Sequence, residues 1–268
     1  MGTTGLVSQS LGKGDYREIV LSVLRNLSVA LLISLIIITL QVPLLNLINH
    51  FFNNSTETQS LIKRYISIRV WSAPAELSIY VLAGLYIGLQ KTKVSSFLLS
   101  TFSILNIIFS YYFVVNLELN IYGVALGTVL SAYLTVAIFL IFSFFYIRNK
   151  FNIIPRYRKI FISKKLLDLF NINLDIFIRT VLLTFSFLWF IYQSSKISED
   201  YLAANTILLQ FIMLASFFLD SYAHSTEGVI GYSLGRKVKK SFLLAVSNSF
   251  RLSFTTGLII SIIYLLFF

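Results

Sequence analysis

The sequence predicts an all-α polytopic membrane protein with seven transmembrane helices. Of its 268 residues, 57% are hydrophobic and only 12% are charged, and the mean hydropathy is +0.81. Soluble domains carry roughly 25% charged residues, and one water-exposed globule of this length could not hide so much apolar surface. The composition therefore excludes an ordinary soluble enzyme and a disordered chain, and we expect no enzymatic activity.

Seven apolar segments are long enough to cross a bilayer, whose hydrocarbon core of about 30 Å needs roughly 20 residues of helix. The predicted spans are 20–42, 65–90, 95–116, 120–147, 167–195, 201–223 and 241–268. Between the fourth and fifth spans lies segment 148–166, the longest and most basic of the connections. We interpret this segment as a linker between two helical lobes, which are 1–147 and 167–268.

The positive charges, 22 lysines and arginines against 11 acidic residues, are concentrated in alternate connections between the spans. The cation-rich connections carry Lys13, Arg17, Lys91, Lys93 and the clusters in 148–165 and 236–240, whereas the intervening connections carry Lys63, Arg64 and Lys196. The positive-inside rule then places the N-terminus in the cytoplasm. Because membrane orientation accounts for these cations, the net charge of +11 indicates no nucleic-acid partner.

Thiol and metal chemistry receive no support from the composition. The chain has no cysteine and two histidines, His50 and His224, so thiol catalysis is excluded and a zinc-type site lacks its usual ligands. No phosphate-binding loop or nucleophile-elbow motif is found. We therefore expect neither a metal nor an organic cofactor.

A short internal repeat indicates that the spans belong to two copies of one unit. Residues 3–12 (TTGLVSQSLG) align with residues 226–235 (TEGVIGYSLG), and five of the ten positions are identical. Six predicted spans, an even number, separate the copies, so both copies face the same side of the membrane, as in the parallel repeats of some transporters. Two complete units would form a twelve-span protein. We expect the chain to be a fragment that lacks two spans at its start and three at its end.

Several segments resemble the multidrug and toxic compound extrusion (MATE) transporters, and among these the bacterial DinF-like branch. The segments that carry the resemblance are 3–15, 65–89, 105–130, 173–180 (NLDIFIRT) and 203–231. Within them, the strings R-x-W-x-A-P (from Arg69) and L-D-x-x-A-H-x-x-E (from Leu219) are the more specific. The resemblance implies a two-lobe, twelve-helix fold that exports organic, often cationic, compounds against an inward H⁺ or Na⁺ gradient.

The same resemblance assigns the chain a place within that fold. Residues 20–147 would be helices three to six of the first lobe, and residues 167–268 the first three helices of the second. It also implies a multi-pass protein of the bacterial inner membrane whose partners are small organic substrates and the bilayer. No cofactor is expected beyond the coupling ion, and the full-length protein is expected to be a monomer.

Charged side chains inside apolar spans cost roughly 2.5–3.5 kcal/mol each on insertion scales, so they are functional candidates. Asp175 and Arg179 lie four residues apart on one helical face. They form either a structural ion pair or a pair that opens when a proton or cationic substrate binds. Asp220, His224 and Glu227 form a stripe on one helical face. This stripe is either a proton path or cation site, or the wet cytoplasmic end of a helix.

Glu76 lies two residues after Pro74 and two helical turns after Arg69. Proline removes a backbone donor and kinks a helix, so we expect a kink at this point. The carboxylate beside it belongs either to a hinge at a binding cavity or to an internal ion pair with Arg69.

The resemblance also reveals a departure from the family pattern. The fifth helix of the DinF-like branch carries an Asn and, four residues later, an Asp that belongs to the proposed proton-coupling site. Asn106 matches the Asn, but Ser110 occupies the Asp position and cannot titrate. The family's proton site in this lobe is therefore incomplete. Asn106, Ser110, Thr128 and Tyr80 are candidates to line a substrate cavity by hydrogen bonding.

Two glycine pairs, Gly84-x-x-x-Gly88 and Gly123-x-x-x-Gly127, place small residues one turn apart in two spans. Small residues at this spacing allow neighbouring membrane helices to approach closely. We interpret both pairs as packing positions.

Two other functions remain open from the sequence. A lipid-linked polysaccharide flippase of the same superfamily would line its cavity with cations that hold a pyrophosphate. Only Arg69 and Arg179 lie well inside spans, and each has a candidate carboxylate partner. A non-transporting seven-span membrane protein would require the chain to be complete, whereas the repeat and the C-terminal span without a polar flank argue against this.

Overall fold

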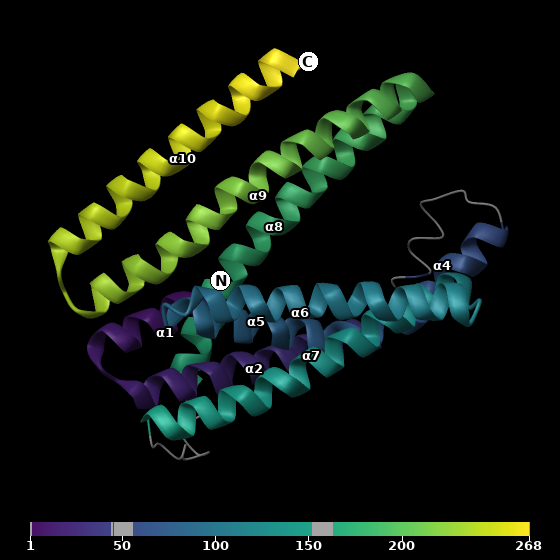
Figure 1. The fold of residues 1–268 in the computed structure, drawn as a ribbon. Helices are drawn as coiled ribbons and strands as arrows, with labels where there is room; N and C mark the ends of the chain where they lie inside the picture. Colours follow the sequence, from purple (N-terminus) through teal and green to yellow (C-terminus); the bar gives the residue numbers. More distant parts are fainter. Residues whose placement is uncertain (1, 44, 46–55, 152–162, 268) are drawn as a thin grey trace.

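The computed structural model describes residues 2–43, 45, 56–151 and 163–267, and these fold almost entirely into helices (Figure 1). The helical segments are α1 (Gly2–Lys13), α2 (Tyr16–Thr39), α4 (Thr56–Arg69), the 3₁₀ turn η1 (Val70–Ser72), α5 (Ala73–Gly88), α6 (Thr92–Tyr111), the π-helical turn η2 (Tyr112–Asn116), α7 (Asn120–Phe151), α8 (Ser163–Ile197), α9 (Glu199–Gly235) and α10 (Lys239–Phe267). No strand occurs in the described ranges, and the all-α prediction is confirmed.

In the described ranges seven helical segments are long and apolar enough to cross a membrane, which confirms the predicted number of spans. They are Tyr16–Thr39, Gln59–Gly88, Thr92–Asn116, Asn120–Phe151, Asn173–Ile197, Glu199–Gly235 and Lys239–Leu266. Several helices extend beyond the predicted spans. α7 continues to Phe151, where cations in its last turn suit the negative end of the helix dipole, and α8 already begins at Ser163. The predicted linker 148–166 is thus helical at both ends, and 152–162 lies outside the described residues.

The N-terminal polar segment forms a buried helix, α1, of 12 residues. The buried side chains of α1 are small, with Thr3, Thr4, Val7, Ser8 and Ser10 among them. Low hydropathy here therefore reflects tight helix packing rather than contact with water, because small side chains let neighbouring backbones approach. Hydropathy alone did not distinguish these two cases.

The helices form two groups (Figure 1). α1, α2 and α4–α7 pack together as the first helix group, and α8–α10 form the second helix group. α1 contacts α2 and α5 within its own group and α9 of the other group. The groups meet at the end that carries the α1–α2 and α9–α10 turns and diverge toward the opposite end, near the α8–α9 turn.

Buried apolar side chains concentrate on α5, which lies between two clusters. One cluster joins α5 to α6 and α7 through Ala75, Ile79, Leu82, Tyr86, Leu98, Ala132, Val136 and Phe139. The other joins α5 to α1 and α2 through Val7, Ile19, Val23, Ala30, Val81, Leu85 and Leu89. The Tyr86 hydroxyl, buried between helices, is hydrogen-bonded to Ser143 at 2.6 Å. α5 is therefore the central helix of the first group.

Both glycine pairs lie at close helix contacts, which confirms their packing role. A Cβ added to Gly88 would lie 2.8 Å from the Thr4 carbonyl oxygen and the Val7 side chain of α1. A Cβ added to Gly127 would lie 2.7 Å from the backbone nitrogen of Ser110 on α6. The missing Cβ atoms set the spacing of α5 from α1 and of α7 from α6.

We predict that Gly88→Ala destabilises the fold by about 1–3 kcal/mol, because an added methyl overpacks the α1–α5 contact. Gly257→Ala is the matched control, because nothing lies within 4 Å of its Cβ position on α10, and alanine there favours the helix by about 0.5–1 kcal/mol. Chemical denaturation in detergent micelles measures both changes. Equal stability of the two variants would contradict the packing role.

Candidate functional site

The two copies of the sequence repeat contact each other where α1 crosses α9. Gly12 faces Gly235, and a Cβ built on either would lie within 3.0 Å of the Cα of the other. Ser8 faces Gly231, where a Cβ on the glycine would lie 3.0 Å from the Ser8 Cβ. In the repeat alignment Gly12 is equivalent to Gly235 and Ser8 to Gly231, so each residue faces its own counterpart.

The backbone contacts at this crossing are reciprocal. The position of a Gly12 Cβ is blocked by the carbonyl oxygen of Tyr232, and that of a Gly235 Cβ by the carbonyl oxygen of Gln9. Gln9 and Tyr232 are again equivalent positions of the repeat. Such exchange of equivalent contacts is the signature of a two-fold related interface. The repeat thus builds the junction between the two helix groups.

The stripe of titratable residues on α9 leads to this junction. Successive helical residues are rotated by about 100°, so Asp220, His224 and Glu227 share the face of Gly231. Asp220 is exposed, whereas His224 and Glu227 are half-buried. Glu227 accepts a hydrogen bond from the backbone of Gly5 on α1. A carboxylate therefore bridges the two helix groups beside their closest contact.

Asp175 and Arg179 are both exposed on α8. The described part of the chain contains no ion pair between them, although their spacing permits one. Both line an open hollow of about 530 Å³ along this helix. The other lining residues are Ile178, Leu182, Leu183 and Ser186. The arrangement leaves a carboxylate and a guanidinium separately accessible beside an apolar wall.

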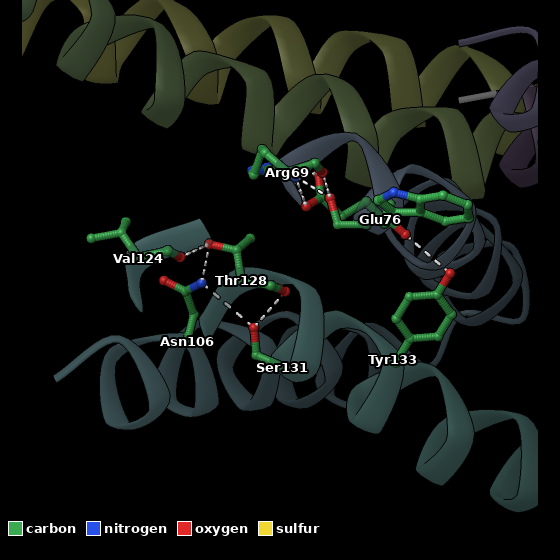
Figure 2. Close-up of polar contacts among 9 residues, drawn as sticks. Arg69, Glu76, Asn106, Val124, Thr128, Ser131 and Tyr133 are labelled. Carbon is green, nitrogen blue, oxygen red and sulfur yellow. Dashed lines mark hydrogen bonds and ion pairs between the residues drawn. The ribbon is translucent and has the colours of Figure 1, made fainter. Parts of the chain in front are cut away.

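Arg69 and Glu76 form an ion pair, which is one of the two arrangements expected from the sequence (Figure 2). Arg69 Nη1 lies 2.6 Å from Glu76 Oε1, and Nη2 donates to Oε2 at 3.1 Å. Arg69 also donates a hydrogen bond to the Ser72 hydroxyl. This two-point contact neutralises both charges within the span Gln59–Gly88.

The ion pair lies across the predicted break in this span. Pro74 lies in the first turn of α5, and the three residues of η1 separate α5 from α4. Beside the break, the Tyr133 hydroxyl of α7 donates to the Trp71 carbonyl oxygen at 3.0 Å. A 3₁₀ stretch within a helix often marks a hinge. The structure thus places the ion pair beside a 3₁₀ turn at the point where the sequence predicts a kink.

Asn106 and Thr128, two of the cavity candidates, are in contact (Figure 2). The Asn106 amide donates to the Thr128 hydroxyl at 2.9 Å and lies 3.5 Å from the Ser131 hydroxyl. The Ser110 hydroxyl, one turn from Asn106, is buried without a hydrogen-bond partner in the described part of the chain. Tyr80 is 64% exposed on α5.

Sequence reasoning did not identify Ser131 and Tyr133 as members of this polar region. Ser131 lies three residues after Thr128, so its place on the same face of α7 was available from helical periodicity. Tyr133 contacts a backbone carbonyl 62 positions away, and no sequence pattern indicates such a contact.

Comparison with known proteins identifies the family. The MatE family model matches residues 1–112 and 176–268. The chain belongs to the MatE family. The match falls in two segments, in keeping with the internal repeat. Members of this family are transporters and not enzymes, and the chain is accordingly a multi-pass membrane protein.

Individual MatE relatives and solved structures agree with this assignment. The chain is 28% identical over 266 residues to DNA damage-inducible protein F of Escherichia coli, covering 99% of the chain and 58% of that protein. It is 24% identical to the multidrug export protein MepA of Staphylococcus aureus, covering 69% of the chain and 41% of that protein. A multidrug resistance MATE transporter in an outward-facing conformation matches with a TM-score of 0.88 at 17% identity, covering 99% of the chain and 59% of that structure.

We predict that Arg69→Ala and Glu76→Ala show a coupling energy of about 1 kcal/mol or more in a double-mutant cycle, because each charge loses its partner inside the span. Denaturation of the two single variants and the double variant in micelles gives this value. The control cycle, Asp175→Ala with Arg179→Ala, is expected to give a coupling near zero. Equal coupling in both cycles would argue against the specific ion pair.

Proposed function

We propose that this MatE chain acts in a secondary antiporter that exports organic, often cationic, compounds in exchange for H⁺ or Na⁺. The observation that carries the proposal is the junction of the two repeat copies at α1 and α9. It joins two helix groups that diverge on one side (Figure 1). Two groups that meet at one end, where α9 contacts both α1 and α5, can rock, and rocking of repeats around a central site is how such transporters alternate access.

Binding of a proton or Na⁺ to the titratable stripe of α9 would drive this movement. Glu227 bonds to α1 across the junction, and Asp220 continues the same face toward the region where the groups diverge. A proton or Na⁺ that neutralises these carboxylates changes the contact of α9 with α1. Such a difference in contacts between two states is what couples ion binding to a conformational equilibrium.

The proposed orientation follows from the position of the cations. The turns bearing Lys13, Lys91 and Lys237 lie at the end where the helix groups meet. With this end in the cytoplasm of a bacterial inner membrane, the N-terminus is cytoplasmic and the divergent side opens outward.

The proposed partners are small organic substrates and the surrounding lipid, with the coupling ion in place of a cofactor. Within the described ranges, no group of three or more acidic, histidine or cysteine side chains could hold a metal. The complete transporter is proposed to act as a monomer, because the junction between its two halves lies within one chain.

One observation favours the alternative function of a lipid-linked polysaccharide flippase. Arg179 lies exposed in its hollow and forms no ion pair in the described part of the chain, so a cation is available to a phosphate-bearing substrate. Arg69, in contrast, is neutralised by Glu76. The single arginine in this hollow is a weak pyrophosphate site, and the organic-compound exporter remains the preferred function.

In the complete gene product, Asp220→Asn and Glu227→Gln are predicted to reduce export at least about tenfold, because neither amide can exchange a proton. Uptake of a fluorescent organic cation into inside-out proteoliposomes, energised by a pH or a Na⁺ gradient, measures this and identifies the coupling ion. Asp200→Asn is the matched control, an exposed position at the far end of the same helix. Wild-type export by both variants would refute the role of the stripe.

Locking the junction is predicted to stop transport. The chain contains no cysteine, so Ser8→Cys with Gly231→Cys introduces one defined pair. Its Cβ atoms would lie 3.0 Å apart, so α1 and α9 must move apart slightly to reach the roughly 3.5 Å that a disulfide needs. Oxidation should abolish export and reduction should restore it. The control pair, Thr226→Cys with Ser249→Cys, crosslinks α9 to α10, where the native hydroxyls are hydrogen-bonded, and should leave export intact. Unchanged export by the oxidised junction pair would exclude rocking at this contact.

A further inference from the structure

The two copies of the repeat differ in the turn that follows each copy. In the first copy, Gly14 has a positive φ of 73°, and the carboxylate of Asp15 accepts the backbone N–H of Glu18 at the start of α2. In the second copy the equivalent positions are Lys237 and Val238. The second turn has therefore exchanged a glycine for a cation and a capping carboxylate for an apolar side chain.

The lysine occupies an unfavourable backbone position. Lys237 has a positive φ of 59°, the left-handed region that suits glycine and costs free energy for other residues. The opposite choice at Gly14 shows that the repeat can place glycine at this point. We therefore expect the side chain of Lys237 to make an interaction whose free energy offsets the cost of this backbone conformation.

The turn carries a concentrated positive charge. Arg236, Lys237, Lys239 and Lys240 lie within five residues, and the first turn of α10 contains no acidic residue. In the described part of the chain none of the four forms a salt bridge. Lys239 and Lys240 also begin α10, where the helix dipole adds to their charge. An anion from outside the chain would relieve this accumulation.

A hollow beside the turn combines this charge with apolar walls. Its volume is about 350 Å³. The lining residues are Ser233, Leu234, Lys237, Val238, Lys239, Phe242 and Leu243. Leu234 and Leu243 each expose about half of their surface. A small soluble anion would use the lysines alone, whereas a phospholipid would use both the lysines and the leucines.

We propose that this hollow binds one anionic phospholipid. Its phosphate lies between Lys237 and Lys239, and the start of an acyl chain lies along Leu234 and Leu243. The turn directly follows α9, a helix long and apolar enough to span a membrane, and basic pockets between such helices recognise anionic headgroups. This binding is independent of the transported substrate.

The decisive variant is Lys237→Gly, which restores the residue of the first copy. It is expected to raise thermal stability in micelles, because backbone strain is removed, and to reduce retained phosphatidylglycerol about fivefold, because one lysine near the surface is lost. Native mass spectrometry of the chain from nanodiscs of equal phosphatidylglycerol and phosphatidylcholine measures the retained lipid. The opposite signs of the two changes separate loss of lipid from loss of folding.

Two further variants and one competition measurement test whether the bound molecule is an anionic phospholipid. Lys93→Gln removes an exposed cation at the same end but outside the hollow and should retain the lipid. Leu243→Ser keeps every cation and should weaken lipid retention. Millimolar inorganic phosphate should not displace the lipid. An equal loss in Lys93→Gln would show unspecific attraction, and displacement by phosphate would show a soluble-anion site; either result overturns the proposal.

Discussion

The close approach of α1 and α9 is the contact on which the rest of the structure depends. Gly12 and Gly235 bring their backbones together without any intervening Cβ atom, and Ser8 and Gly231 extend the contact by one turn. A larger side chain at Gly12 or Gly235 would push the backbones of α1 and α9 apart. This constraint explains why a segment of low hydropathy is buried, because small residues are selected for contact distance rather than for apolar surface.

The same contact gives the charges of α9 their significance. An isolated carboxylate in a membrane helix is costly, yet Glu227 lies where the backbone of α1 can satisfy it, and in the proposed mechanism a change in its charge would alter the junction. In the first helix group, the cost of a charged side chain is offset by an ion pair within one span. Arg69 and Glu76 neutralise each other across a proline-induced break, so their charges stabilise one helix instead of linking two groups.

The divergence of the two repeat copies shows how one ancestral turn can acquire two roles. Gly14 and Asp15 end α1 and begin α2 by ordinary turn and capping chemistry. Lys237 and Val238 provide neither a turn glycine nor a capping carboxylate, and instead they line a basic hollow with an apolar wall. Because both turns lie at the end where the helix groups meet, a lipid bound at the second turn would lie close to the junction.

The sequence by itself determined the helical membrane class, the seven spans and the repeat, and it placed Arg69 and Glu76 on one helical face, because these depend on hydropathy and on periodicity within one helix. Only the tertiary structure decided that the repeat copies face each other, that Glu227 reaches α1 and that Tyr133 reaches the Trp71 carbonyl. It also left Asp175 and Arg179 apart, although their spacing permits a pair. Periodicity fixes the face of a helix on which a residue lies, whereas its partner depends on which other helix packs there.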